Sequence, residues 1–301
     1  MSFNEGAQLD TSQVTGAGGG GGGSRGGVVI GGGVGGIILT IIIVLLGGDP
    51  GTISSMDPGQ VTTGGSEAST ADFSQCKTGA DANKDDTCRI IGTVNSVQSF
   101  WSDALPKQSN VQYQDVKTVI FSGVTQSACG QASNNTGPFY CPSDQRVYID
   151  PTFMDLLSSQ FGGSSGALAQ EYVLAHEYGH HVQDLLGILA KAQDGQTGAT
   201  SNSVRTELQA DCFAGVWANH AATTKDDNGT TLLQPLTDTD IKDALSAAAA
   251  VGDDHIQSTM GGGVDQDSWT HGSSEERERW FTNGYRAGDI QACDTFNTND
   301  L

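Results

Sequence analysis

Five consecutive residues, His176-Glu177-Tyr178-Gly179-His180, contain the side chains that zinc chemistry requires. Two histidines four positions apart on a helix lie on the same face, so both rings can bind one metal ion. Glu177 follows the first histidine, where it cannot easily join the coordination sphere but can reach a water molecule on the metal. The pattern therefore predicts a helix that binds zinc through His176 and His180, with Glu177 as the general base.

A third ligand is needed to distinguish this motif from a chance match, because a catalytic zinc site has three protein ligands and one open position. Metzincins place a histidine six residues after the second one, but this sequence has Leu186 there. Gluzincins use a glutamate on a later helix and an aspartate four residues further on, and Glu207 with Asp211 matches that spacing. We expect Glu207 to complete a site for one zinc ion per chain and Asp211 to accept the spare N–H of His176.

The alternative for Glu207 and Asp211 is a pair of solvated acids on a surface helix. Their neighbours Leu208, Ala210 and Phe213 are apolar, which indicates that this helix is largely buried. Unpaired acids are costly in such surroundings, so we prefer the metal role.

His271 is the main remaining candidate for chemistry. It precedes a predicted helix that begins with a capping box formed by Ser273 and Glu276. In thermolysin-like gluzincins a downstream histidine stabilises the oxyanion of the tetrahedral intermediate, and His271 is a candidate for that catalytic role. The alternative is a helix-entry residue that packs or hydrogen-bonds locally.

The other polar candidates have simpler interpretations. His181 points away from the two ligands, which suggests packing or support of the site. His220 and His255 are expected at the surface. Asp253 and Asp254 could bind a cation, but we prefer the interpretation that they cap a helix or are solvated.

The elements that must position these residues are mainly helical. Helices are predicted over residues 94–105, 151–161, 169–186, 203–220, 237–251 and 273–286, and strands over 116–124 and 146–149. This pattern predicts an α+β domain with a small β-sheet. An edge strand of such a sheet could pair with an extended peptide, and residues 147–149 are the candidate for it.

The composition changes sharply before residue 71. Residues 1–26 are low-complexity and Gly-rich, which predicts a disordered tail. Residues 27–48 carry no charge, and this run is long enough for a membrane span. Its most apolar part is the stretch 37–46. A cleaved signal peptide is the alternative, but no small-residue cleavage site follows Leu46. We expect a single transmembrane helix at 27–48, a flexible linker at 49–70 and a folded domain at 71–301.

The cysteines indicate the compartment of the folded domain. All six follow the apolar run, and an even number on one side suggests disulfides in an oxidising compartment. Zinc ligation by cysteine is the alternative, but the sequence has no CxxC. Nearest-neighbour pairing would join Cys76 to Cys88, Cys129 to Cys141 and Cys212 to Cys293, with other pairings left open.

The charge distribution gives an orientation and excludes one class of partner. Arg25 precedes the apolar run and Asp49 follows it, so the positive-inside tendency places the tail in the cytoplasm and the domain outside. The formal net charge of −21 argues against nucleic acid as a partner, since phosphate binding needs Lys and Arg. We therefore expect a single-pass membrane protein whose C-terminal domain lies outside the cytoplasm.

Five ordered segments resemble a known family. They are 129–132 (CGQA), 137–142 (GPFYCP), 176–181 (HEYGHH), 207–215 (ELQADCFAG) and 271–275 (HGSSE). Over roughly residues 71–295 they are similar to the bacterial neutral zinc metallopeptidase family. The resemblance implies a membrane-anchored zincin of the bacterial cell envelope with gluzincin-like ligands, and it supplies no substrate.

The residues and the resemblance together predict a zinc peptidase acting on a peptide or protein. Zinc would polarise the scissile carbonyl, and Glu177 would move the proton from water to the leaving amine. One alternative is a non-catalytic, membrane-anchored zinc-containing binding module, which would have no use for Glu177. Another is a zinc amidase acting on cell-wall peptides, which the ligand set does not distinguish.

Overall fold

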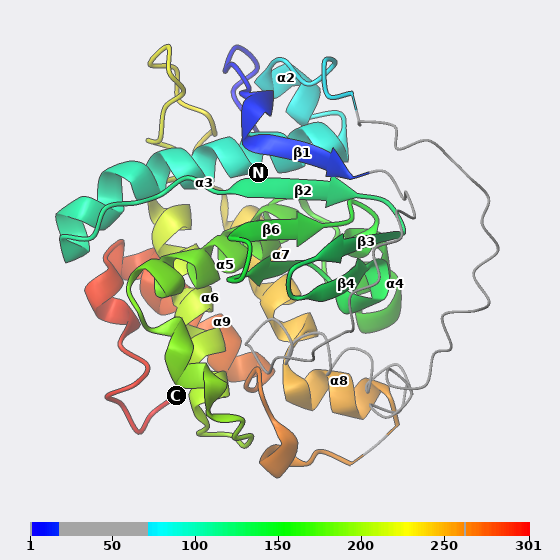
Figure 1. Cartoon of the computed structure of the whole chain (residues 1–301), viewed down its shortest axis with the longest axis vertical. Coiled ribbons are helices and arrows are strands. Elements are labelled where there is room, and N and C mark those ends of the chain that lie inside the picture. Colours follow the sequence, from blue (N-terminus) through cyan, green and yellow to red (C-terminus); the bar gives the residue numbers. More distant parts are fainter. Residues whose placement is uncertain (1, 18–71, 262) are drawn as a thin grey trace.

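The computed structural model describes residues 2–17, 72–261 and 263–301 (Figure 1). The predicted span at 27–48 and the predicted linker at 49–70 lie outside these residues. Among the described residues, no helix is long and apolar enough to cross a membrane.

The described part of the chain is mainly helical, as predicted. The helices are α2 (Gly79–Ala82), α3 (Asp86–Ser109), α4 (Phe153–Phe161), α5 (Ala167–Leu185), α6 (Asn202–His220), α7 (Asp238–Ala250), α8 (Asp253–Thr259) and α9 (Ser274–Ala287). The strands are β1 (Val14–Ala17), β2 (Lys117–Phe121), β3 (Val124–Ser127), β4 (Gly130–Ser133), β5 (Phe139–Cys141) and β6 (Arg146–Ile149). The prediction of an α+β domain with a small sheet is confirmed.

The main sheet has four strands in the order β1-β2-β6-β5. β1, β2 and β6 are parallel, whereas β5 is antiparallel to β6. β3 and β4 form a separate antiparallel hairpin. The prediction that residues 147–149 form an edge strand is wrong, because β6 pairs on both sides and β5 takes the edge. The short β5 lacks the length and alternation that would have predicted a strand.

The prediction of a disordered tail over residues 1–26 is wrong for residues 2–17. Residues 14–17 form β1, which pairs with β2 along one side of the sheet (Figure 1). Phe3, Ala7 and Val14 are buried in the main hydrophobic core. The glycine run begins only at residue 18, so reading 1–26 as one low-complexity segment hid the apolar residues that precede it.

Helix α5 lies at the centre of the helical layer and packs against α3, α6 and α7, while α6 packs along α9. Close helix packing depends on glycines at three contacts. A Cβ at Gly179 of α5 would lie 3.0 Å from the Ala210 carbonyl oxygen of α6. Gly215 of α6 and Gly284 of α9 face backbone atoms of the opposite helix, where no side chain fits. These contacts bring the motif on α5 close to the acidic residues of α6.

Three disulfides join elements that are separate in the fold. Cys76 bonds Cys88, Cys129 bonds Cys141 and Cys212 bonds Cys293, so the nearest-neighbour pairing is confirmed. The second links the β3–β4 hairpin to the edge strand β5. The third ties α6 to the C-terminal segment, beside the helix face that carries Glu207 and Asp211.

Candidate metal centre

The two histidines of α5 and Glu207 of α6 form one buried cluster. Their ligand atoms all lie within 4.8 Å of one another. His176 Nε2 is 3.2 Å from Glu207 Oε2, and His180 Nε2 is 3.5 Å from Glu207 Oε1. The structure therefore brings together the three residues that the sequence predicted as ligands.

The chemistry of this cluster fits zinc. His180 Nε2 is buried and has no hydrogen-bond partner among the described residues, although it faces the Glu207 carboxylate. A buried nitrogen lone pair without a partner is costly unless a cation uses it. Two imidazoles and one carboxylate are also a ligand set of catalytic zinc sites, which keep a fourth position for water.

His176 is held in place by a buried ionic network. Its Nδ1 lies 2.7 Å from Asp211 Oδ1, which orients Nε2 toward Glu207, as the sequence predicted. Arg277 of α9 donates from Nε and Nη2 to the two Asp211 oxygens at 2.9 Å, and the Tyr172 hydroxyl donates to Oδ1. Burial alone would raise the pKa of Asp211, but Arg277 and His176 outweigh it and lower the pKa. Asp211 is therefore a carboxylate that fixes the ring of His176.

His180 is held by an amide network that the sequence analysis missed. Its Nδ1 lies 2.9 Å from Gln183 Oε1, which accepts the ring N–H and leaves Nε2 facing Glu207. The Gln183 amide donates to the Thr206 carbonyl and to Gln209 Oε1. Gln209 in turn donates to the Cys293 carbonyl at 2.9 Å. The available signal was the spacing of Gln183, three positions after His180 on the same helix face.

Glu177 connects the motif to the edge of the sheet. Its side chain is buried, and the Tyr140 backbone N–H of β5 donates to Glu177 Oε2 at 2.9 Å. Burial raises the pKa of Glu177, while the neighbouring His176 and His180 oppose the shift. The carboxyl is thus fixed beside the ligand cluster, and the edge strand β5 runs past it.

His271 lies in the segment between α8 and α9, and Asp253 holds that segment. Asp253 Oδ2 accepts the backbone N–H groups of Thr270, His271 and Gly272 at 2.7–3.0 Å. Its other oxygen lies 3.3 Å from His271 Nδ1. Burial lowers the pKa of His271, but Asp253 and the Glu207 carboxylate outweigh it and raise the pKa. The expectation that Asp253 is solvated or caps a helix is wrong, because it is buried and binds a loop distant in sequence.

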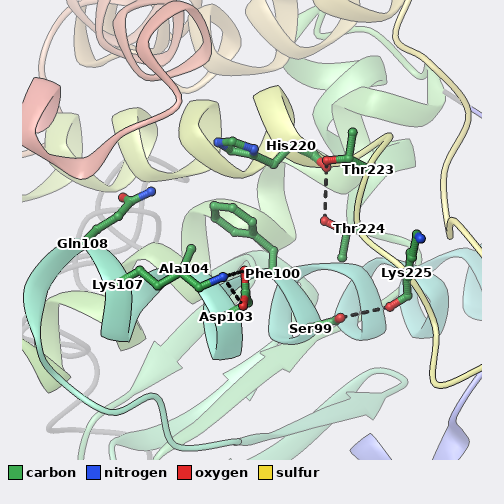
Figure 2. A pocket seen from close by; sticks show the side chains of 10 residues that line it. All are labelled: Ser99, Phe100, Asp103, Ala104, Lys107, Gln108, His220, Thr223, Thr224 and Lys225. Carbon is green, nitrogen blue, oxygen red and sulfur yellow. Dashed lines mark hydrogen bonds and ion pairs between the residues drawn. The ribbon is translucent and has the colours of Figure 1, made fainter. Parts of the chain in front are cut away.

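The remaining histidines lie outside the cluster. His181 is buried and bonds to the Gln114 carbonyl and the Tyr140 hydroxyl, in agreement with a packing role. His255 is half-buried, and its Nε2 lies 2.8 Å from the Phe161 carbonyl. His220 is half-buried as well, stacks on Phe100 and lines a hollow of about 450 Å³ between α3 and the end of α6 (Figure 2). None of the predicted ligands lines this hollow.

Comparison with known proteins agrees with the geometry. A family model described as "Putative neutral zinc metallopeptidase" matches residues 4–296. The chain is 54% identical to the uncharacterized protein Rv2575 of Mycobacterium tuberculosis (strain H37Rv) over 302 residues, covering all of both chains. It is 41% identical to the uncharacterized protein YpfJ of Escherichia coli K12 over 221 residues, which covers 71% of this chain and 73% of that protein. No solved structure matches the chain. Since the family model spans nearly the whole chain, the protein belongs to this neutral zinc metallopeptidase family.

Proposed function

We propose that the protein is a zinc-dependent peptidase in which His176, His180 and Glu207 hold the metal and Glu177 is the general base. The observation that carries this proposal is the buried three-residue cluster with the Glu177 carboxyl beside it. A zinc ion bound there supplies a Lewis acid and lowers the pKa of a water molecule. Glu177 accepts a proton from the attacking water and transfers it to the leaving amine.

Two groups position these catalytic residues. The Tyr140 N–H occupies Glu177 Oε2, which leaves Oε1 to accept the proton. His271, fixed by Asp253, is our candidate for stabilising the oxyanion, because its raised pKa favours the protonated, hydrogen-bond-donating ring. β5 is the last strand on its side of the four-stranded sheet, and an extended peptide that adds a strand beside β5 would run past Glu177. We therefore propose peptides or proteins as substrates.

We place the domain in an oxidising compartment outside the cytoplasm. Three disulfides support this location, since such bonds persist where thiols are not kept reduced. Residues 27–48 remain our candidate for a membrane anchor.

Cleavage profiling of a peptide library with the purified full chain tests the activity. Glu177→Gln should keep about one zinc per chain and lose cleavage, because the amide cannot accept a proton. Glu275→Gln is the matched control, since Glu275 is exposed and should leave cleavage unchanged. Unchanged cleavage in Glu177→Gln contradicts the mechanism. Loss of zinc from that variant contradicts the assignment of Glu177 as base.

A further inference from the structure

The first described segment, residues 2–17, is an integral part of the metallopeptidase domain. It contributes β1 to the sheet, with Val14 paired to Thr118 and Ala17 to Phe121. Its Ser2 carbonyl accepts from Gln234 N–H, and its Asn4 N–H donates to the Leu232 carbonyl. We infer that residues 2–17 fold in the same compartment as residues 72–301, so that the apolar run at 27–48 has both of its flanks on one side of the membrane.

The Phe3 side chain is buried against helix α3, at a position where α3 has a glycine. The side chain is fully buried, and its ring lies against Gly92 in the interior of α3. A Cβ at Gly92 would lie 2.5 Å from Phe3 Cε1, closer than real Cβ contacts come. Glycine in a helix interior is less favourable than alanine, so Gly92 is explained by the ring that it accommodates.

Two asparagines of the domain each bind the backbone of one N-terminal residue through both groups of their amide. Asn83 accepts from the Phe3 N–H at 2.8 Å and donates to the Phe3 carbonyl at 2.9 Å. Asn95 accepts from the Asp10 N–H at 2.9 Å and donates to the Asp10 carbonyl at 3.0 Å. Asn95 is buried, so the loss of its backbone partners would leave its amide groups unsatisfied.

The position of this segment decides between two topologies. A tail in the cytoplasm would leave the Phe3 site empty, β2 without one neighbour and both asparagines without their backbone partners. The disulfides place residues 72–301 in an oxidising compartment, so the segment that completes their core belongs there too. This replaces the expected single-pass span with its tail in the cytoplasm, because one crossing would separate residues 2–17 from residues 72–301.

Labelling of introduced thiols in spheroplasts that express the full chain tests the topology directly. All six native cysteines are in disulfides, so a membrane-impermeant maleimide reports only a new thiol. Glu5→Cys and Lys84→Cys place exposed thiols on the N-terminal segment and on the domain. We expect both variants to be labelled to the same extent before permeabilisation. Labelling of Lys84→Cys before and of Glu5→Cys only after permeabilisation would overturn the inference.

A double-mutant cycle on the purified full chain tests the packing independently of the membrane. Phe3→Ala should lower Tm by roughly 10 °C, as expected for truncation of a buried aromatic ring in a chain of this size. Gly92→Ala should lower Tm with Phe3 in place but not in the Phe3→Ala background, where the clash is gone. Gly6→Ala, with no atom within 4 Å of its Cβ, should change little.

Additive effects, or a rise in Tm for Gly92→Ala with Phe3 present, would show that the ring is elsewhere and overturn the inference. If Phe3→Ala does not fold, Phe3→Leu takes its place in the cycle. The expected directions of the Tm changes are then the same. Neither test depends on peptidase activity, so failure of the proposed function would leave both readouts intact.

Discussion

Glu171 should make the stability of the domain fall as pH rises, and Glu171→Gln should remove most of that dependence. The residue lies on α5, five positions before His176, and is fully buried. Neither carboxyl oxygen has a hydrogen-bond partner among the described residues. Burial raises the pKa of Glu171 from 4.5 to about 8, although the charge of Arg89 opposes the shift. The folded protein therefore keeps this carboxyl protonated at neutral pH.

The magnitude follows from the difference in pKa between the folded and unfolded chains. The unfolded chain releases the proton near pH 4.5, whereas the folded chain retains it up to about pH 8. Stability is then greatest below the unfolded pKa and is lost as pH rises toward the folded one. At about 1.4 kcal/mol per pKa unit, the loss between pH 5 and pH 8 is about 3.5 kcal/mol.

Denaturant unfolding of the full chain at pH 5, 6, 7 and 8 measures this difference. The free energy of unfolding of wild type minus that of Glu171→Gln should fall by about 3.5 kcal/mol across the range. Subtracting the two curves removes the pH dependence of groups that both proteins share, including the metal ligands. Glu275→Gln should give a flat difference, because Glu275 is exposed. A flat difference for Glu171→Gln would refute the assignment of a buried, protonated carboxyl.

Three further predictions concern the groups that hold the site. Arg277→Met should lower zinc affinity roughly 10–100-fold in a chelator-competition assay, because Asp211 loses its partner. Arg277→Lys should recover only part of the lost affinity. Unchanged affinity in both variants would contradict the network. Gln183→Leu should lower zinc affinity roughly tenfold in the same assay, because His180 Nδ1 loses its acceptor, and wild-type affinity would show that Gln183 does not position the ring. Asp253→Asn should lower kcat at least tenfold with zinc content and KM little changed, because it weakens the contacts between residue 253 and His271. A change in zinc content alone would argue for a structural role.

The local spacing of residues within single helices determined much of the candidate site in advance. His176 and His180, and likewise Glu207 and Asp211, share a helix face because four residues make slightly more than one turn. That periodicity does not depend on tertiary context, so each pair could be placed on one helix face, and the gluzincin spacing connected the two pairs into one ligand set. The even number of cysteines and their order along the chain similarly agreed with the observed disulfides.

Only the tertiary structure decided which distant elements complete the site and the domain. Arg277 lies sixty-six positions from Asp211, and Asp253 binds a loop eighteen positions away, so no local period connects these pairs. The edge strand β5 is defined by pairing alone, which leaves little trace in a segment of three residues. Residues 2–17 precede the glycine run, and the contact of Phe3 with Gly92 that makes them part of the core joins residues far apart in sequence. Such contacts depend on how close two packed surfaces come, and a single sequence does not state that distance.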